Sequence, residues 1–457
     1  MAGPGGAEGG PASAAVAPGP VASGDGGTIR GMVAVRAIAA GEVVLRVPLA
    51  RCVTEAAARA ALPELFAGAA DDDDDVDPPA GVAREDVLAC FLLAERAKGA
   101  ASAWAECIAA LPARYDGLVA WSAAEAAALP PDWRGFHADL RQRHLAALAR
   151  LRAQLPAASA LRAHLTEAGW TWAAAALHSR SMDLPDTRPG GAGRLVVLAP
   201  GADLFNHALD VAAGRSHRLA ADGAAVEVVA TRAYAAGEEV CISYGKKPSS
   251  RLLIGYGFVL PENPHDRVEV AIRIPMNSGP GDAASGLLLR AATAFSAAAP
   301  GGGGEALSEF DLPMTLDVPD MEALFANPKA QLHFVARFNL RAAAPLPAQL
   351  VAMMRIRTAE PEALAAAAGS EAAFDALCAG EGRGEAEERR ALEALAALLA
   401  ERAEGLDDST TTTTATGDPA EVPYRERLAR QLRAAELAIL GQAREAVRSR
   451  LRETTAA

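Results

Sequence analysis

The sequence predicts an α+β protein, in which a β-rich domain carrying a helical insertion is followed by an all-α domain. Three observations predict this fold class. β-branched runs flank a turn at 31–48 and again at 232–245, helical periodicity fills 84 to about 176, and it returns after about 305. Because 457 residues exceed one ordinary core, more than one domain is expected. The expected limits are a tail at 1–27, a β-rich domain at 28–266 with its insertion at about 82–176, and a helical domain at 267–457.

The N-terminal segment 1–27 is rich in Gly, Ala and Pro and predicts a disordered tail. It lacks the basic start and apolar middle of a secretory signal. It also contains no Arg or Lys, unlike a typical transit peptide. The tail therefore does not indicate a cellular compartment.

The two β-rich runs contain a short, nearly repeated sequence. "RAIAAGEVV" at 36–44 is nearly repeated by "RAYAAGEEV" at 232–240. In each, a turn-forming "AAGE" precedes β-branched residues, which is typical of a hairpin. Chance is one explanation in an Ala-rich chain, but both copies predict the same piece of structure.

The middle of the chain predicts helices. At 84–99 the acidic residues lie in the first turn, and four apolar residues share one face: Val87, Leu88, Phe91 and Leu92. Beyond about 305 the same spacing recurs at Leu392, Leu395, Leu399, Leu428, Leu432 and Ile439.

Three further segments predict disordered loops from their Gly, Pro, Asp or Thr content: 67–81, 277–304 and 405–419. The aspartate run at 71–75 predicts a solvated loop rather than a metal site, because consecutive carboxylates repel one another.

Composition excludes several function classes. With 44 basic against 57 acidic residues the formal charge is −13, which disfavours a nucleic-acid surface. No run approaches the ~18 apolar residues of a membrane span. The five cysteines have no spacing typical of a zinc site or a disulfide framework, which favours a reducing, intracellular compartment. A protein or small-molecule partner is expected, with no nucleic acid and no membrane.

Short polar and aromatic motifs follow one another through the β-rich domain. They are Ser179-Arg180, Asp203 with Asn206-His207, Ser243-Tyr244-Gly245 and Tyr256-Gly257-Phe258. The chain has five tyrosines, yet three of them lie between 234 and 256. Either these tyrosines fill a strand core, which suits their shape, or two phenols surround one reacting centre.

Together with Gly31 to Ala34, this order of motifs resembles the SET-domain protein methyltransferases, in the subgroup of the Rubisco large-subunit lysine methyltransferase. The resemblance covers 28–266. The C-terminal helices are similar to the family's substrate-binding domain only in helicity and position. It implies a β-rich SET catalytic fold with a helical insertion and an all-α substrate-binding domain. It also implies S-adenosyl-L-methionine as cofactor and a protein substrate, in the cytoplasm or the chloroplast.

The resemblance also implies residue roles. Tyr244 is the expected catalytic residue, with its hydroxyl aimed at the reacting amine and methyl. The expected cofactor-binding residues are Arg30, Gly31, Met32, Arg180, Asn206 and His207. The expected substrate-binding residues are Arg180, Met182, Asp203, Tyr256 and Phe258. A simple salt bridge to Asp183 or Asp203 is the alternative for Arg180, and no metal site is expected.

These residue types suit methyl transfer. The reaction is an in-line displacement, which needs the reacting atoms held about 3–3.5 Å apart. A free lysine titrates near ~10.4, so an apolar, aromatic-walled channel helps to keep the target amine neutral.

Two departures from the family pattern bear on the target. Met182 stands where many members carry an aromatic residue, and "PSSR" replaces the usual Ser-Asn-Ala-Glu. A histidine-directed relative has an asparagine at the place of Met182, where it can hydrogen-bond an imidazole. Because a thioether instead suits the alkyl stem of a lysine, we predict a monomeric protein-lysine N-methyltransferase acting on a non-histone protein.

Three alternatives to this activity differ in how well they suit the sequence. A histidine methyltransferase of the same fold stays open, and so does a SET module that has lost catalysis. An unrelated helical-repeat scaffold is disfavoured, because the helical segments have no fixed period.

Overall fold

The structure is a computed structural model. It describes residues 15–23, 27–65, 84–188, 193–211, 216–275, 283–297, 314–317, 333–406 and 423–456. The chain divides into two units, of which unit 1 contains 1–126 and 134–260 and unit 2 contains 127–133 and 261–457. The domain limits expected from the sequence stay a prediction.

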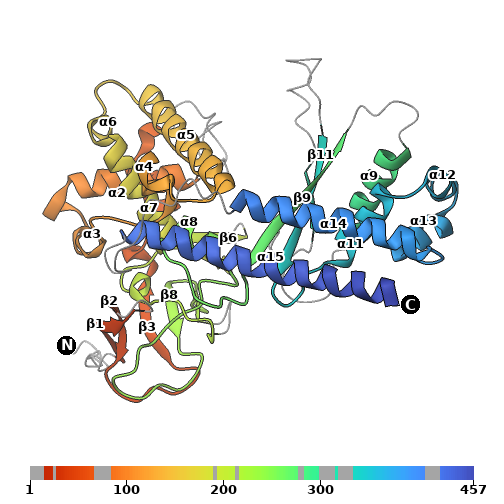
Figure 1. The fold of residues 1–457 in the computed structure, drawn as a ribbon. Helices are drawn as coiled ribbons and strands as arrows, with labels where there is room; N and C mark the ends of the chain where they lie inside the picture. The colour runs from red at the N-terminus through yellow and green to blue at the C-terminus, as the bar shows by residue number, and fades with distance from the viewer. Residues whose placement is uncertain are drawn as a thin grey trace, which may run out of the picture. The chain divides into compact units, whose positions relative to one another are not determined.

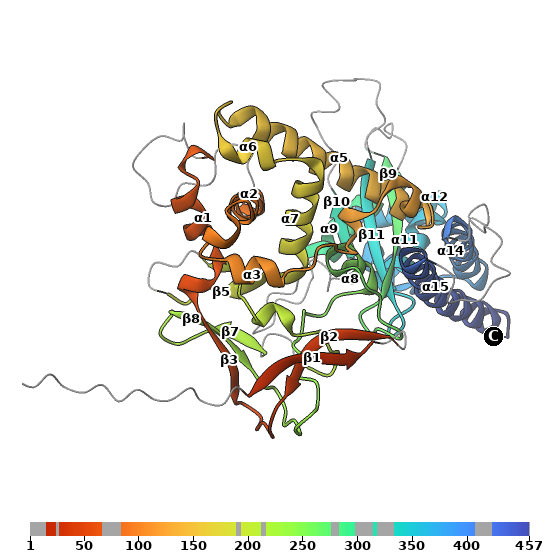
Figure 2. The same ribbon diagram turned by 90° about the vertical axis from the view of Figure 1, so that its left-hand side faces the viewer.

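Small antiparallel sheets form the β-rich part of unit 1 (Figures 1 and 2). One pairs β1 (Val16–Ala22) with β2 (Thr28–Ala34). A second has the order β3 (Val43–Pro48), β8 (Ala225–Val229) and β7 (His217–Leu219). A third has the order β4 (Val53–Thr54), β6 (Arg194–Leu198) and β5 (Met182–Pro185). Apolar side chains of these strands, except those of β4, share one core cluster, against which Tyr244 packs.

The helices of the insertion lie on the side of unit 1 away from β1, β2 and β3 (Figures 1 and 2). They are α2 (Arg84–Ala97), α3 (Ala105–Ala110), α4 (Ala123–Ala126), α5 (Pro131–Gln154), α6 (Ala160–His164) and α7 (Glu167–Arg180), and α1 (Glu55–Ala61) precedes them. The apolar face predicted for α2 is confirmed, because Val87, Leu88, Phe91 and Leu92 are all buried. α7 begins where the Thr166 hydroxyl accepts a hydrogen bond from the Gly169 N–H.

Unit 2 is helical but not all-α, which corrects the prediction. The antiparallel strands β9 (Arg267–Pro275), β10 (Met314–Asp317) and β11 (His333–Arg341) form a sheet in the order β10-β11-β9. In "RVEVAIRIP" every second side chain is buried, from Val268 to Ile274. This period of two is typical of a half-buried strand.

The helices of unit 2 pack with this sheet around a second core. They are α9 (Ala283–Ala297), α11 (Ala348–Arg357), α12 (Pro361–Gly369), α13 (Glu371–Ala379), α14 (Glu385–Leu406) and α15 (Tyr424–Ala456). The predicted stripe along α14 is confirmed, because Leu392, Leu395 and Leu399 are buried in this core. Helices α14 and α15 lie side by side (Figure 1).

The prediction of a disordered tail at 1–27 is wrong for residues 16–22, which form β1. This strand pairs with β2 along its whole length, from Val16 opposite Ala34 to Ala22 opposite Thr28. Pro18 and Pro20 are compatible with it because an edge strand can lack the N–H donors that a central strand needs. Residues 1–14 and 24–26 lie outside the described residues.

The predicted loop at 277–304 is wrong for 283–297, which form α9. The predicted loops at 67–81 and 407–419 lie outside the described residues, and 405–406 belong to the end of α14. None of the helices that the structure describes has the length and apolar character needed to traverse a lipid bilayer.

Candidate active site

The segment after the second "AAGE" turn joins two parts of unit 1. On one side Ala34 N donates to Glu238 O at 2.9 Å, and Val240 N donates to Met32 O at 2.7 Å. On the other side Ile242 N donates to Asn206 O at 2.9 Å, and Ala208 N donates to Ile242 O at 3.2 Å. Residues 238–242 therefore bring β2 and the Asn206-His207 motif to the same place.

Tyr244 lies just after this segment and is held at both ends. Its backbone N–H donates to His207 Nδ1 at 3.1 Å, and its hydroxyl donates to Phe205 O at 2.8 Å. Its ring stacks on His207 with a centroid separation of 5.2 Å. The hydroxyl therefore has a fixed direction.

Two more aromatic rings surround Tyr244. Tyr256 ends α8 (Ser249–Tyr256) and stacks on Tyr244 at 4.5 Å, and the Phe258 ring lies 6.4 Å from Tyr244 and 6.2 Å from Tyr256. The structure thus brings together the three aromatic residues expected at the reacting centre. Tyr234 does not join them, because it is a buried core residue whose backbone pairs with Ile38.

The phenols of this group stay protonated at neutral pH. Burial raises the pKa of Tyr244 above its usual range, and the neighbouring Tyr256 raises it further. Burial also raises the pKa of Tyr256 to about 12. Both hydroxyls therefore remain hydrogen-bond donors.

Arg180 forms a salt bridge with Asp203, which the sequence left as an alternative. Its Nη1 donates to Asp203 Oδ2 and to Asp203 O, both at 2.9 Å, while Asp183 pairs instead with Arg194. The buried Arg180 Nε has no hydrogen-bond acceptor among the described residues. The guanidinium also lies 5.9 Å from the ring centroid of Tyr115.

Asn206 links β2 to the second copy of the turn. Its Nδ2 donates to Arg30 O at 3.1 Å and to Glu239 Oε1 at 2.8 Å. A Cβ at Gly31 would lie 2.5 Å from the same Glu239 oxygen and 2.8 Å from Val21 Cγ2. Gly31 therefore leaves room for the protein's own side chains.

Glu239 and Tyr115 lie at the candidate site but were not predicted from the sequence. The sequence does contain a signal for Glu239, because a charged residue interrupts the apolar run of the second copy where the first copy has Val43. Tyr115 also had one, because it is one of only five tyrosines. It lies in the helical insertion, far from the other motifs along the chain.

The two predicted methionines lie in the strand core. Met32 is 4% exposed and Met182 is 6% exposed, and both belong to the cluster against which Tyr244 packs. The structure thus places both side chains in the core that packs against Tyr244.

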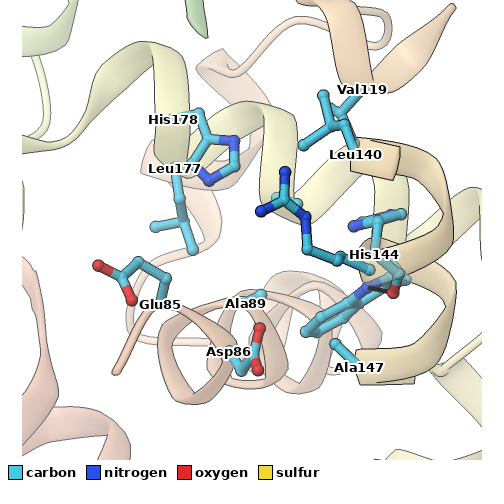
Figure 3. A pocket seen from close by; sticks show the side chains of 12 residues that line it. Glu85, Asp86, Ala89, Val119, Leu140, His144, Ala147, Leu177 and His178 are labelled. Carbon is cyan, nitrogen blue, oxygen red and sulfur yellow. Dashed lines mark hydrogen bonds between the residues drawn. The ribbon is translucent and has the colours of Figure 1, made fainter. Parts of the chain in front are cut away.

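A cavity of about 180 Å³ lies elsewhere, between α2, α5 and α7 (Figure 3). Two histidines line it, His144 and His178, and His144 is already engaged, with Nε2 3.1 Å from Thr171 Oγ1 and its ring stacked on Trp170. In the described ranges no three His, Cys, Asp or Glu side chains converge as a metal site would require.

Two family models match the chain. The model of the SET domain matches residues 29–245, and the model described as Rubisco LSMT substrate-binding matches residues 323–440. The curated protein SET DOMAIN GROUP 40 of Arabidopsis thaliana is 26% identical over 282 residues. That match covers 54% of this chain and 54% of the relative, so the chain spans about half the relative's length.

Solved structures with the same fold include those of Rubisco LSMT. The SET domain of LSMT bound to methyllysine and AdoHcy has a TM-score of 0.65, and Rubisco LSMT bound to sinefungin and monomethyllysine has one of 0.66. Each is 18% identical, and the match covers 97% of this chain and 89% of that chain. The predicted α+β fold class is confirmed, with the sheet of unit 2 as the correction.

Proposed function

We propose that this chain, which belongs to the SET-domain proteins that carry a Rubisco LSMT substrate-binding domain, methylates lysine residues of a non-histone protein with S-adenosylmethionine. One observation carries the proposal. The Tyr244 hydroxyl is fixed by Phe205 O at the centre of three aromatic rings. The solved LSMT structures support it by their shared fold; they are bound to lysine or methyllysine with AdoHcy, to monomethyllysine with sinefungin, or to AdoMet.

The residues expected to hold the cofactor fit its polar groups. Asn206 has both hydrogens of Nδ2 engaged, while its Oδ1 has no partner among the described residues. It can therefore accept a hydrogen bond from a ligand. His207 is fixed through Nδ1 by the Tyr244 N–H. We assign Asn206, His207 and Arg180, with the main chain at Arg30, Gly31 and Met32, to the cofactor.

Part of that main chain is already occupied. Of the backbone groups expected near the cofactor, Arg30 O already accepts from Asn206 Nδ2 and Met32 O already accepts from Val240 N. Side chains must therefore supply much of the recognition.

When bound, S-adenosylmethionine supplies an electrophilic methyl group on a sulfonium sulfur. The protein's task is to hold the amine in line with it. Because the Tyr244 hydroxyl donates to Phe205 O, its oxygen lone pairs remain for an amine N–H. Tyr244 is therefore the proposed catalytic residue, and it positions the nucleophile rather than taking a proton.

The aromatic walls favour the reactive form of the lysine. A lysine amine must lose its proton before it can attack, and an apolar site lowers the pKa of an ammonium group. Tyr256 and Phe258 are the proposed walls, with Met182 in the adjoining core. Asp203, held by Arg180, is proposed to lie on the substrate side.

The proposed partner is a protein, bound by the C-terminal domain. A monomer suffices, because every residue assigned to the site lies in unit 1 of one chain. All five cysteines are free, which supports a reducing compartment, and we propose the cytoplasm or the chloroplast.

Incubation of a cell extract with methyl-labelled S-adenosylmethionine tests the activity. We expect label in a discrete non-histone protein with the wild-type chain and a near-complete loss of label with Tyr244→Phe. A SET module without catalysis would bind the cofactor in calorimetry but add no label. Equal labelling by both chains would contradict the role of Tyr244.

A further inference from the structure

Glu239 lies where β2, the second copy of the turn and the Asn206 side chain meet. Its Oε1 accepts a hydrogen bond from Asn206 Nδ2 at 2.8 Å, and Arg30 O accepts the other Nδ2 hydrogen at 3.1 Å. Both donors of the amide are therefore used inside the protein. The two contacts fix the direction of the amide and turn Asn206 Oδ1 away from them.

The groups left over at this point are acceptors. They are the Glu239 carboxylate and Asn206 Oδ1, which has no partner among the described residues. The thiol of Cys241 also lies beside Glu239, and its pKa is raised to about 12 by burial first and by this carboxylate second. Cys241 therefore stays a neutral thiol and brings no positive charge.

Glu239 is a partly buried anion without a cation. Over the ranges that the structure describes it forms no ion pair, whereas the preceding Glu238 pairs with Arg232 at 2.7 Å. A partly buried carboxylate is stabilised by an opposite charge, and a charge-assisted hydrogen bond is stronger than a neutral one. This place in the fold is therefore suited to a cationic donor.

We propose that Glu239 receives the α-ammonium group of the cofactor and orients Asn206 to share it. This inference rests on the proposed function, because it concerns the same cofactor. An ammonium group has three donors and no acceptor, which matches a site whose free polar atoms are all acceptors. Glu239 is thus a cofactor-binding residue in its own right and a positioning residue for Asn206.

The neighbouring backbone is adapted to this side chain. A Cβ at Gly31 would lie 2.5 Å from Glu239 Oε1 and 3.0 Å from Asn206 Nδ2. A contact under 3.0 Å would force the carboxylate to move. Gly31 therefore keeps the Glu239 and Asn206 side chains in contact.

Calorimetry with two ligands tests the charge pairing. One is S-adenosylhomocysteine, and the other is its analogue without the α-amino group. The wild-type chain is compared with Glu239→Gln, which keeps an acceptor for Asn206 but removes the charge. Glu238→Gln is the matched control, because it makes the same change one residue away, outside the site.

We expect Glu239→Gln to weaken S-adenosylhomocysteine binding about tenfold or more, from the strength of hydrogen bonds to charged groups. The affinity for the analogue without the amino group is expected to stay within about twofold of the wild-type value, since no ammonium remains to be lost. Glu238→Gln is expected to match the wild-type chain for both ligands.

Other outcomes overturn the proposal. Equal weakening for both ligands would show a structural role, and no weakening for either would show no role at all. If Glu239→Gln does not fold, Glu239→Ala is measured with the same two ligands and must lose affinity for S-adenosylhomocysteine only. A wild-type chain that binds the analogue as tightly as S-adenosylhomocysteine would overturn the proposal without any variant. A wild-type chain that binds neither ligand would overturn the proposed function as well.

Discussion

The two "AAGE" turns have the same local structure. In the first, Arg36 pairs with Glu42, and Ala39 N donates to Glu42 Oε2 at 3.1 Å. In the second, Arg232 pairs with Glu238 at 2.7 Å, and Ala235 N donates to Glu238 Oε2 at 2.8 Å. The expectation that both copies supply the same turn is therefore confirmed. The hairpin expected around the first turn is wrong, because β2 pairs with β1 and β3 pairs with β8.

The two copies also pair with each other. Ile38 N donates to Tyr234 O at 2.9 Å, and Tyr234 N donates to Ile38 O at 3.0 Å. These residues occupy the same place in the two copies, so the turns are related by an approximate local symmetry.

The copies differ in the segment after the turn. The first continues as β3 and pairs with β8, while the second runs between β2 and the Asn206-His207 motif. At the positions where the first copy has the exposed Val43 and then Pro48, the second has Glu239 and Tyr244. The difference shows that a short local signal specifies the turn, whereas the partners on either side decide whether a site forms.

Removing the Tyr244 hydroxyl from the second copy is expected to have the largest effect on activity. We expect Tyr244→Phe to lower kcat by about 100-fold or more, because it loses the fixed hydroxyl that we propose positions the amine. Tyr234→Phe, in the structural part of the same copy, is the control and is expected to keep most of its activity. Steady-state rates of label transfer check both, and similar losses in the two variants would contradict the assignment.

Asn206→Ala tests the Asn206-His207 motif independently of the turn. It removes the two hydrogen bonds that Asn206 Nδ2 donates, one to Arg30 O of β2 and one to Glu239 Oε1 of the second copy. We expect S-adenosylhomocysteine to bind about tenfold more weakly in calorimetry, since a positioned polar group is lost. Val43→Ala, at the first-copy counterpart of Glu239, serves as control, and an unchanged affinity for Asn206→Ala would mean that the motif is only a turn.

The turn glycines of the two copies have the same backbone conformation. Gly41 has φ of 85° and Gly237 of 86°, and neither has an atom within 4 Å of an added Cβ. Because L-residues are strained at positive φ, we expect Gly41→Ala and Gly237→Ala each to lower the free energy of unfolding by about 1–2 kcal/mol. Urea unfolding measures both. We expect only Gly237→Ala to reduce activity as well, and the reverse pattern would contradict the difference between the copies.

The smallest effects are expected from the turn salt bridges. Arg36 and Arg232 are both exposed, so their ion pairs are screened by solvent. Arg36→Ala and Arg232→Ala should shift the urea midpoint only slightly, with the larger shift for Arg232, whose guanidinium also lies 4.0 Å from the Tyr234 ring centroid. A large loss of stability in either variant would show that the turn depends on its charges.

Much of the fold could be predicted from periodicity. The buried face of α2 and the stripe of α14 follow from helical spacing alone. β1 could not, because its Gly and Pro residues resemble a linker and its stability comes from pairing with β2. The sheet of β9, β10 and β11 was missed for a similar reason, since its strands are distant in sequence.

The candidate site could be predicted as far as its motifs are local. The proposed site residues Tyr244, Asn206 and His207 were recognised from their order along the chain. Glu239 was not, because a lone glutamate gains meaning only from the side chains that the fold places beside it. Arg180 shows the same limit, since only the structure identifies Asp203 as its partner.

Identification of the residue that receives the methyl group tests the proposed protein-lysine methyltransferase activity. An extract is labelled with methyl-labelled S-adenosylmethionine and the wild-type chain, and the labelled protein is digested and analysed by mass spectrometry. We predict the added methyl on the ε-amino group of a lysine, because Met182 offers an apolar neighbour and no partner for an imidazole. A methyl group on a histidine ring, or no labelled protein at all, would contradict it.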